Sequence, residues 1–223
     1  MSPDSIVIVS GGMDSVTLLH HLVKHNQRQP AVLSFNYGQK HSKELVYAQT
    51  HAQILNCAIH QVIDLTPFRN IFGKSALVAK EVNIPSIRSV EGDPQPVTYV
   101  PNRNMIFLAL AVAFAESLGV SDVYYGAQRH DMYGYWDTTL EFLEKLNTVY
   151  TLNRKTPVRI SAPFVHYSKA DILRTGLKLD VDYSQTWSCY KGDSDACGKC
   201  PTCAERLVAF SEVGIVDPLP YQT

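Results

Sequence analysis

The feature that most constrains the fold is a short apolar run that leads directly into a glycine turn and then into a helical pattern. Residues 6–9 read Ile-Val-Ile-Val, a β-branched run typical of a buried parallel strand. Ser10-Gly11-Gly12 follows, and the missing Cβ atoms let backbone N–H groups approach an anion closely. Apolar residues then recur at helical spacing, at Val16, Leu18, Leu19, Leu22 and Val23. A strand, a glycine turn and a helix N-terminus in this order predict an anion-binding site.

The side chains of this turn narrow the prediction to phosphate chemistry. Ser10 and Ser15 add hydroxyl donors, and Asp14 is placed either to cap the helix or to hold a metal bound to phosphate. The turn is not a Walker A loop, because it lacks the glycine spacing and the Gly-Lys-Ser/Thr ending of that motif. Ser-Gly-Gly-x-Asp-Ser instead resembles the pyrophosphate loop of ATP pyrophosphatases, enzymes that adenylate an oxygen and release pyrophosphate. An ordinary βα turn rich in small residues is the alternative interpretation.

The resemblance to a pyrophosphate loop implies a set of nucleotide-binding residues. Asp14 and Ser15 are expected to take part in catalysis as well as in binding. The expected nucleotide contacts within the loop are Ile8, Val9, Ser10, Gly11, Gly12, Met13, Asp14 and Ser15.

The rest of the chain alternates strand patterns with helix patterns. Further strands are expected at 31–35, 59–64, 123–126 and 158–160, and further helices at 42–55, 103–118, 138–152, 168–177 and 201–213. This alternation predicts an α/β fold with a doubly wound, Rossmann-like parallel sheet of five strands. Ligands of such sheets bind outside the carboxyl ends of the strands, where the glycine turn already lies.

Residues 67–96 break the alternation. The segment contains Pro85, Gly92, Pro94 and Pro96 and shows no sustained periodicity. Loops of this length are usually lids, binding loops or disordered segments, so a partly ordered loop over the site is expected, with a short helix around 75–81.

The bulk composition limits the class of protein. At 223 residues the chain is expected to form one main domain, residues 1–185, with a C-terminal segment, residues 186–223, packed on it. The net charge of −1 argues against a nucleic-acid partner. No apolar stretch reaches membrane-spanning length, and Asp4 leads straight into a strand, unlike a signal peptide. We therefore expect a cytoplasmic protein without a membrane partner.

Four of the five cysteines lie within fifteen residues near the C-terminus. Four thiolates satisfy tetrahedral Zn²⁺, and the two x2 spacings let the backbone turn around an ion. A closed four-cysteine site leaves no open position, so a structural role is expected. An iron–sulfur cluster with the same ligands is the alternative. The predicted ligands are Cys189, Cys197, Cys200 and Cys203.

Two cations are expected at the positive ends of helices, where only a nearby anion makes them favourable. Arg103 follows Asn102, the expected N-cap of its helix. Lys169 follows Ser168, with Asp171 completing a partial capping box. Both cations are predicted to face phosphate and to act in catalysis; the alternative for Arg103 is an ordinary solvated side chain.

Taken together, the motifs resemble the 7-cyano-7-deazaguanine synthase family over nearly the whole chain. The similar stretches are Ser10 to Ser15, Tyr37-Gly38-Gln39-Lys40-His41, Tyr99 to Asn104, Ser168-Lys169-Ala170-Asp171, Thr186-Trp187-Ser188-Cys189-Tyr190 and the cysteine cluster. The resemblance implies 7-carboxy-7-deazaguanine and ammonia as substrates, with ATP, Mg²⁺ and structural zinc, in a homodimer. Lys40 and His41 follow the second strand on the ligand side, where either a substrate contact or a solvated side chain is expected.

One stretch departs from the family. The family usually reads close to Gly-Tyr-Pro-Asp-Cys-Arg after the fourth strand, whereas residues 134–139 read Gly-Tyr-Trp-Asp-Thr-Thr. We expect Tyr135 or Trp136 to stack on the base and Asp137 to accept from its N–H donors. The substrate carboxylate would then meet Arg129 or Lys40, with Asp131 nearby.

Alternatives remain open at this point. In the departing stretch, Trp136 could simply pack against the next helix, or the chain could act on a related deazapurine. A tRNA-modifying pyrophosphate-loop enzyme and a non-catalytic nucleotide-binding zinc module are the rival functions.

Overall fold

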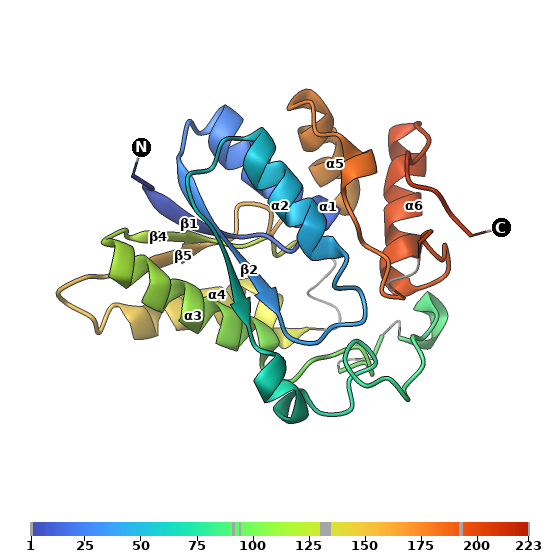
Figure 1. Cartoon of the computed structure of the whole chain (residues 1–223), viewed down its shortest axis with the longest axis horizontal. Coiled ribbons are helices and arrows are strands. Elements are labelled where there is room, and N and C mark those ends of the chain that lie inside the picture. The colour runs from blue at the N-terminus through green and yellow to red at the C-terminus, as the bar shows by residue number, and fades with distance from the viewer. Residues whose placement is uncertain (1, 91, 94, 130–134, 192–193, 223) are drawn as a thin grey trace.

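The computed structural model describes residues 2–90, 92–93, 95–129, 135–191 and 194–222, and its centre is a parallel five-stranded sheet (Figure 1). The strands are β1 (Ser5–Ile8), β2 (Pro30–Asn36), β3 (His60–Asp64), β4 (Asp122–Tyr124) and β5 (Arg159–Ser161). Their order in the sheet is β3-β2-β1-β4-β5, and all four pairings are parallel. The predicted fold class is therefore confirmed.

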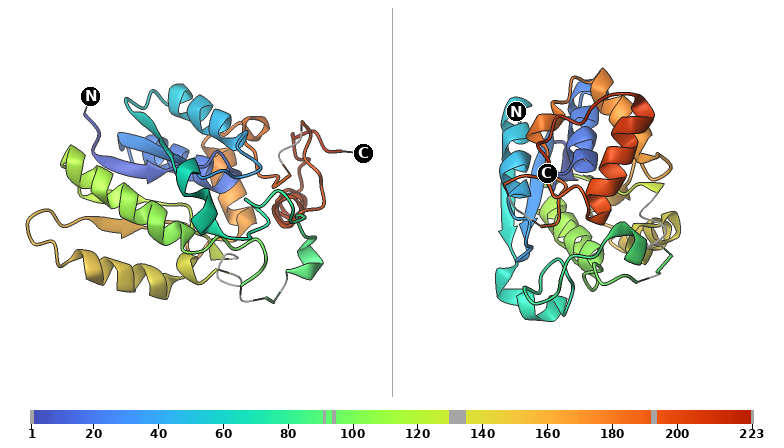
Figure 2. Two further views of the ribbon diagram at one scale, coloured as in Figure 1. Left: turned by 60° about the horizontal axis from the view of Figure 1, so that its bottom comes forward. Right: turned by 90° about the vertical axis from the view of Figure 1, so that its right-hand side faces the viewer.

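Helices cover both faces of the sheet (Figure 2). One face carries α1 (Met13–His20), α2 (Glu44–Ile54) and α5 (Lys169–Lys178), and the other carries α3 (Arg103–Leu118) and α4 (Leu140–Tyr150). The last helix, α6 (Pro201–Val213), packs on α5. None of the described helices is long and apolar enough to cross a membrane.

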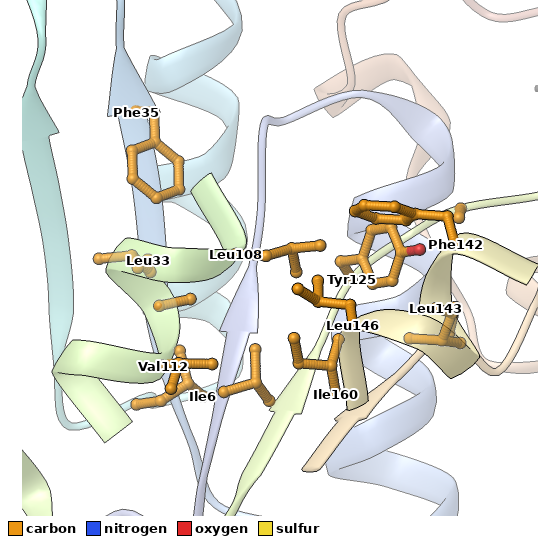
Figure 3. Packing of buried hydrophobic residues seen from close by; sticks show 14 of the residues in the cluster. Ile6, Leu33, Phe35, Leu108, Val112, Tyr125, Phe142, Leu143, Leu146 and Ile160 are labelled. Atoms are coloured by element: carbon orange, nitrogen blue, oxygen red, sulfur yellow. The ribbon is translucent and has the colours of Figure 1, made fainter. Parts of the chain in front are cut away.

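The two apolar faces of the central strands explain this double covering. Ile6 faces the cluster beneath α3 and α4, and its neighbour Val7 faces the cluster beneath α1, α2 and α5. Both are completely buried, and each such side chain contributes roughly 1.5–3 kcal/mol to folding. Figure 3 shows the first cluster, in which side chains of the sheet meet Leu108 and Val112 of α3 and Leu146 of α4.

The helix expected around residues 75–81 is not formed. These residues make turns, of which 75–79 are buried and 80–81 exposed, and the short helical turns lie on either side, at Thr66–Phe72 and Ile87–Ser89. The reason is tertiary pairing of the backbone: Ala76 N donates to Val97 O at 2.8 Å, and Leu77 O accepts from Lys40 N at 2.9 Å. The segment is held against the rest of the fold by these bonds instead of by helical ones.

The N-terminus of α3 also differs from expectation. Asn102 has a φ of 52° and its side chain makes no capping hydrogen bond. Asp137 takes over this role, since its Oδ2 accepts from Asn104 N at 3.1 Å. At α5 the expected capping box is present in both directions between Ser168 and Asp171.

Candidate active site and metal centre

The sheet reverses its winding between β1 and β4, and a cavity opens there at the carboxyl ends of the strands. Its volume is about 950 Å³. The ends of β1, β2 and β4 form its floor, and residues from 87–98 and from the cysteine-rich segment form parts of its walls. The predicted residues that line it are Ile8, Val9, Ser10, Gly12, Met13, Asp14, Ser15, His41, Arg103, Tyr135 and Lys169.

Internal hydrogen bonds hold the glycine turn after β1 in shape. Gly11 has a φ of +99°, and a Cβ on it would lie 1.9 Å from the carbonyl oxygen of Glu44, so only glycine fits. Ser15 Oγ accepts from Ser10 N at 3.2 Å, and Ser10 Oγ accepts from Gly12 N at 3.3 Å. Gly11 O accepts from Trp187 N at 2.9 Å, which ties the turn to the cysteine-rich segment. The loop is therefore a preformed anion cradle at the start of α1.

Lys169 lies at the first position of α5 and is 6% exposed. Its Nζ is 3.4 Å from Asp14 Oδ2 and 3.0 Å from Glu205 Oε2. The other oxygen, Asp14 Oδ1, is buried without a hydrogen-bond partner in the described part of the chain. A carboxylate oxygen left bare beside a phosphate-type loop is a ligand that suits Mg²⁺.

Arg103 extends from α3 into the cavity. Its Nη1 donates to Tyr37 Oη at 3.4 Å, and its guanidinium lies 5.9 Å from the centre of the Tyr37 ring. Burial opposes the charge, but Tyr37, Tyr190 and other neighbours outweigh it and raise the pKa of Arg103 above its ordinary value. Among the described residues no carboxylate forms an ion pair with it. The guanidinium is therefore available to an anionic ligand.

A buried carboxyl group that sequence reasoning missed also lines the cavity. Glu44, in the first turn of α2, lies beside His41, and both side chains are almost fully buried. Burial raises the pKa of Glu44 to about 8 and lowers the pKa of His41 to about 3. Glu205, Tyr37 and Tyr190 are further cavity residues that were not predicted. Glutamate is common in the first turn of a helix, so the sequence around Glu44 does not indicate that its side chain lines a cavity.

The remaining predicted substrate residues do not line the cavity. Lys40 Nζ donates to Val82 O at 2.6 Å, and Arg129 is exposed. Trp136 is 44% exposed; its Nε1 donates to Tyr99 Oη at 2.9 Å, and its ring packs edge-on against Phe142. Asp137 caps α3 as described above. Asp131, and Gly134 of the departing stretch, lie outside the described residues.

The four predicted cysteine ligands come together in a cluster that could hold a metal ion. Their Sγ atoms all lie within 4.8 Å of one another, and all four residues are buried. Backbone N–H groups of Cys197 and Cys200 donate to the sulfurs of Cys189 and Cys197, each at 3.3 Å. Such bonds stabilise thiolates, and four thiolates with no open position fit tetrahedral zinc.

The fold and the loop together define a pyrophosphate-loop ATP pyrophosphatase type of α/β protein. Two solved structures share this fold. NMN synthetase from Francisella tularensis has a TM-score of 0.58 at 16% identity, covering 96% of this chain and 79% of that one. The U34-tRNA thiolase NcsA from Methanococcus maripaludis has a TM-score of 0.51 at 13% identity, covering 95% and 66%.

Sequence comparison then identifies the family. A family model described as "Queuosine biosynthesis protein QueC" matches residues 4–214, and the chain belongs to this family. A protein named 7-cyano-7-deazaguanine synthase from Alteromonas mediterranea is 44% identical over 222 residues, the full length of both chains. One from Pseudoalteromonas atlantica is 46% identical over 97% of this chain and 98% of its own, and one from Caldicellulosiruptor saccharolyticus is 43% identical over 98% and 95%.

Proposed function

We propose that the chain converts 7-carboxy-7-deazaguanine and ammonia to 7-cyano-7-deazaguanine at the expense of ATP. As a member of its family it is an enzyme, a ligase that forms a carbon–nitrogen bond. The observation that carries the proposal is the preformed pyrophosphate-type loop opening onto one cavity, in a chain similar over its full length to proteins named for this reaction.

The first step requires activation of a poor electrophile. A carboxylate resists attack by ammonia, so its oxygen is adenylated and pyrophosphate leaves. N–H groups of the Ser10–Ser15 loop and the Lys169 ammonium stabilise the departing charge, and Arg103 faces the anionic acceptor. Asp14 would hold Mg²⁺, which would neutralise phosphate charge when bound.

The later steps complete the nitrile. Ammonia displaces AMP and gives a primary amide, with one proton passing to solvent. Adenylation of the amide oxygen by a second ATP, followed by loss of AMP and a proton, leaves the carbon–nitrogen triple bond. Water must be excluded, or the activated acyl group hydrolyses. Ile87, Val90 and Pro96 of the 67–96 segment line the cavity and support this segment as the shield.

The cysteine centre is proposed to hold structural zinc. The cysteines pack with Trp187, and the backbone N–H of Trp187 donates to the carbonyl oxygen of Gly11 in the loop. The metal would therefore support the ATP site without contacting the reacting groups. Clustered free thiols require a reducing compartment, which supports a cytoplasmic location. We propose residues 1–185 and 186–223 as the division between catalytic domain and zinc segment.

A homodimer is also proposed. Its support is apolar surface at one edge of the molecule: Val62 of the edge strand β3 is 41% exposed, and Phe68 and Ile71 beyond it are 54% and 64% exposed. Analytical ultracentrifugation tests this, and a monomer at all concentrations contradicts it.

The reaction is tested by incubating the protein with ATP, ammonium and 7-carboxy-7-deazaguanine and identifying products by mass. The expected product is the nitrile, with AMP and pyrophosphate. ATP binding without pyrophosphate release would instead indicate a non-catalytic nucleotide-binding module, and pyrophosphate release only with tRNA would indicate a tRNA-modifying enzyme.

A further inference from the structure

Glu44 is a buried carboxyl group with an unused face toward the cavity. It is 7% exposed and lines the cavity from the first turn of α2. Its Oε1 accepts from Gln39 Nε2 at 3.2 Å and lies 3.6 Å from His41 Nε2. Its Oε2 makes no hydrogen bond within the described part of the chain. A carboxylate oxygen of a buried residue that lines a cavity suits a ligand that donates hydrogen bonds.

The neighbour Gln39 fixes the direction in which Glu44 points. Gln39 Oε1 accepts from Tyr37 N at 2.9 Å, so its Nε2 must be the donor group on the other side. That Nε2 donates both to Phe35 O at 3.1 Å and to Glu44 Oε1. Glu44 is therefore braced by an amide that can only donate to it, and its second oxygen is left for the cavity.

The other acidic groups of the inner cavity are already paired. Asp14 and Glu205 share the Lys169 ammonium, at 3.4 and 3.0 Å. Glu44 has no lysine or arginine partner among the described residues. Among the described residues, Glu44 is therefore the buried carboxyl group of the cavity that forms no ion pair with a lysine or an arginine.

The surroundings of Glu44 suit a flat ring that carries an anionic group. Phe35, whose carbonyl holds Gln39, stacks on Phe107 with the ring centres 4.0 Å apart. Both phenylalanines line the cavity. Arg103 lines the same cavity, and its positive charge lowers the pKa of Glu44 against the effect of burial. An acceptor, an aromatic wall and a guanidinium therefore meet in one space.

We propose that Glu44 determines the base specificity of the enzyme: in its ionised form, which N–H donors of a ligand favour, it accepts from the N–H groups on the pyrimidine edge of the deazaguanine. In this arrangement Arg103 faces the carboxylate at the opposite end of the substrate. Gln39 is a positioning residue that acts through Glu44. The inference rests on the proposed function, because it assumes a deazaguanine substrate.

The test compares binding of two ligands to two proteins without ATP. The ligands are 7-carboxy-7-deazaguanine and the analogue that lacks the 2-amino group, and the proteins are the parent and Glu44→Gln. The parent should prefer the full ligand by on the order of 100-fold, because the analogue leaves a buried acceptor unpaired. Glu44→Gln should reduce this preference below about 10-fold, because glutamine places an N–H₂ group against the N–H donors.

A matched glutamate variant and the affinity for ATP serve as controls. Glu212→Gln, an exposed glutamate at the rim of the cavity, should retain the parent's preference. ATP affinity should be unchanged in Glu44→Gln. If Glu44→Gln does not fold, as judged by its thermal transition, the parent alone decides: equal affinity for the two ligands overturns the proposal.

Other outcomes also overturn the inference. These are an undiminished preference in folded Glu44→Gln, a loss of ATP affinity alone, or a raised KM for ammonium alone. A parent protein that binds neither ligand and forms no nitrile contradicts the proposed function itself, so the two failures are distinguishable.

Discussion

Removal of the Asp217 carboxylate probes a buried ion pair that holds the C-terminal segment together. Arg206 of α6 is 1% exposed and Asp217 is 8% exposed. Arg206 Nε and Nη2 donate to the two oxygens of Asp217 at 2.6 and 2.9 Å. The remaining donors of Arg206 bond Thr186 Oγ1 at 2.7 Å and Tyr183 O at 2.9 Å. The pair therefore links α6, the C-terminal tail and the chain that leads into the cysteine centre.

The expected cost follows from what the substitution leaves behind. Asp217→Ala leaves a guanidinium buried without its carboxylate partner, and breaking a buried pair in this way costs about 3–5 kcal/mol. Replacing both partners, as Arg206→Met with Asp217→Leu, removes the stranded charge and should recover at least roughly half of the loss. At a urea m value of about 2–2.5 kcal/mol/M, a loss of about 4 kcal/mol lowers the midpoint by roughly 1.6–2 M.

The assay is urea unfolding followed by circular dichroism, with zinc at a fixed excess because a bound metal adds to stability. Glu141→Ala is the matched control, since it breaks only the exposed Glu141–Lys145 pair on α4 and should leave the urea midpoint close to that of the parent. A loss below about 1 kcal/mol in Asp217→Ala, or no recovery in the double variant, would refute the reasoning.

Three further predictions concern the metal, the phosphate loop and acid stability. Cys200→Ser should lower bound zinc and the thermal transition together, because metal binding and folding are coupled; iron with acid-labile sulfide in anaerobically purified protein contradicts the zinc assignment. Ser15→Ala should abolish pyrophosphate release while the circular dichroism spectrum stays that of the parent, since its hydroxyl orders the loop; undiminished release contradicts the loop's role. Burial and the neighbouring His51 lower the pKa of His20 from 6.5 to about 4. The folded state therefore keeps the full contribution of neutral His20 to its stability above pH 6.5 and loses this contribution as the pH falls toward 4. This loss amounts to about 3 kcal/mol in urea unfolding, and a His20→Gln variant that loses stability over the same range as steeply as the parent would contradict the assignment.

The strand–glycine–helix stretch could be predicted because its pattern is local. The glycine at position 11 and the apolar residues at helical spacing after it belong to one short stretch of sequence. The parallel arrangement of the strands follows from their alternation with helices. The cysteine centre was predictable for the same reason, since its last three ligands are separated by only two residues each.

The missed features depend on contacts between distant segments. Glu205 reaches Lys169 across two helices, and Asp137 replaces Asn102 as the cap of α3. Arg206 and Asp217 are ordinary surface residue types whose pairing appears only once the tail folds back. Residues 75–79 have a helix-compatible composition, but tertiary backbone bonds override it.

The most direct test of the central claim is the stoichiometry of a complete reaction with limiting 7-carboxy-7-deazaguanine, excess ATP and ammonium. The account predicts one nitrile and two pyrophosphates per substrate consumed, with the primary amide rising and then falling as the intermediate. Pyrophosphate release that leaves the carboxylate unchanged, or that stops at the amide with a single pyrophosphate per substrate, would contradict it.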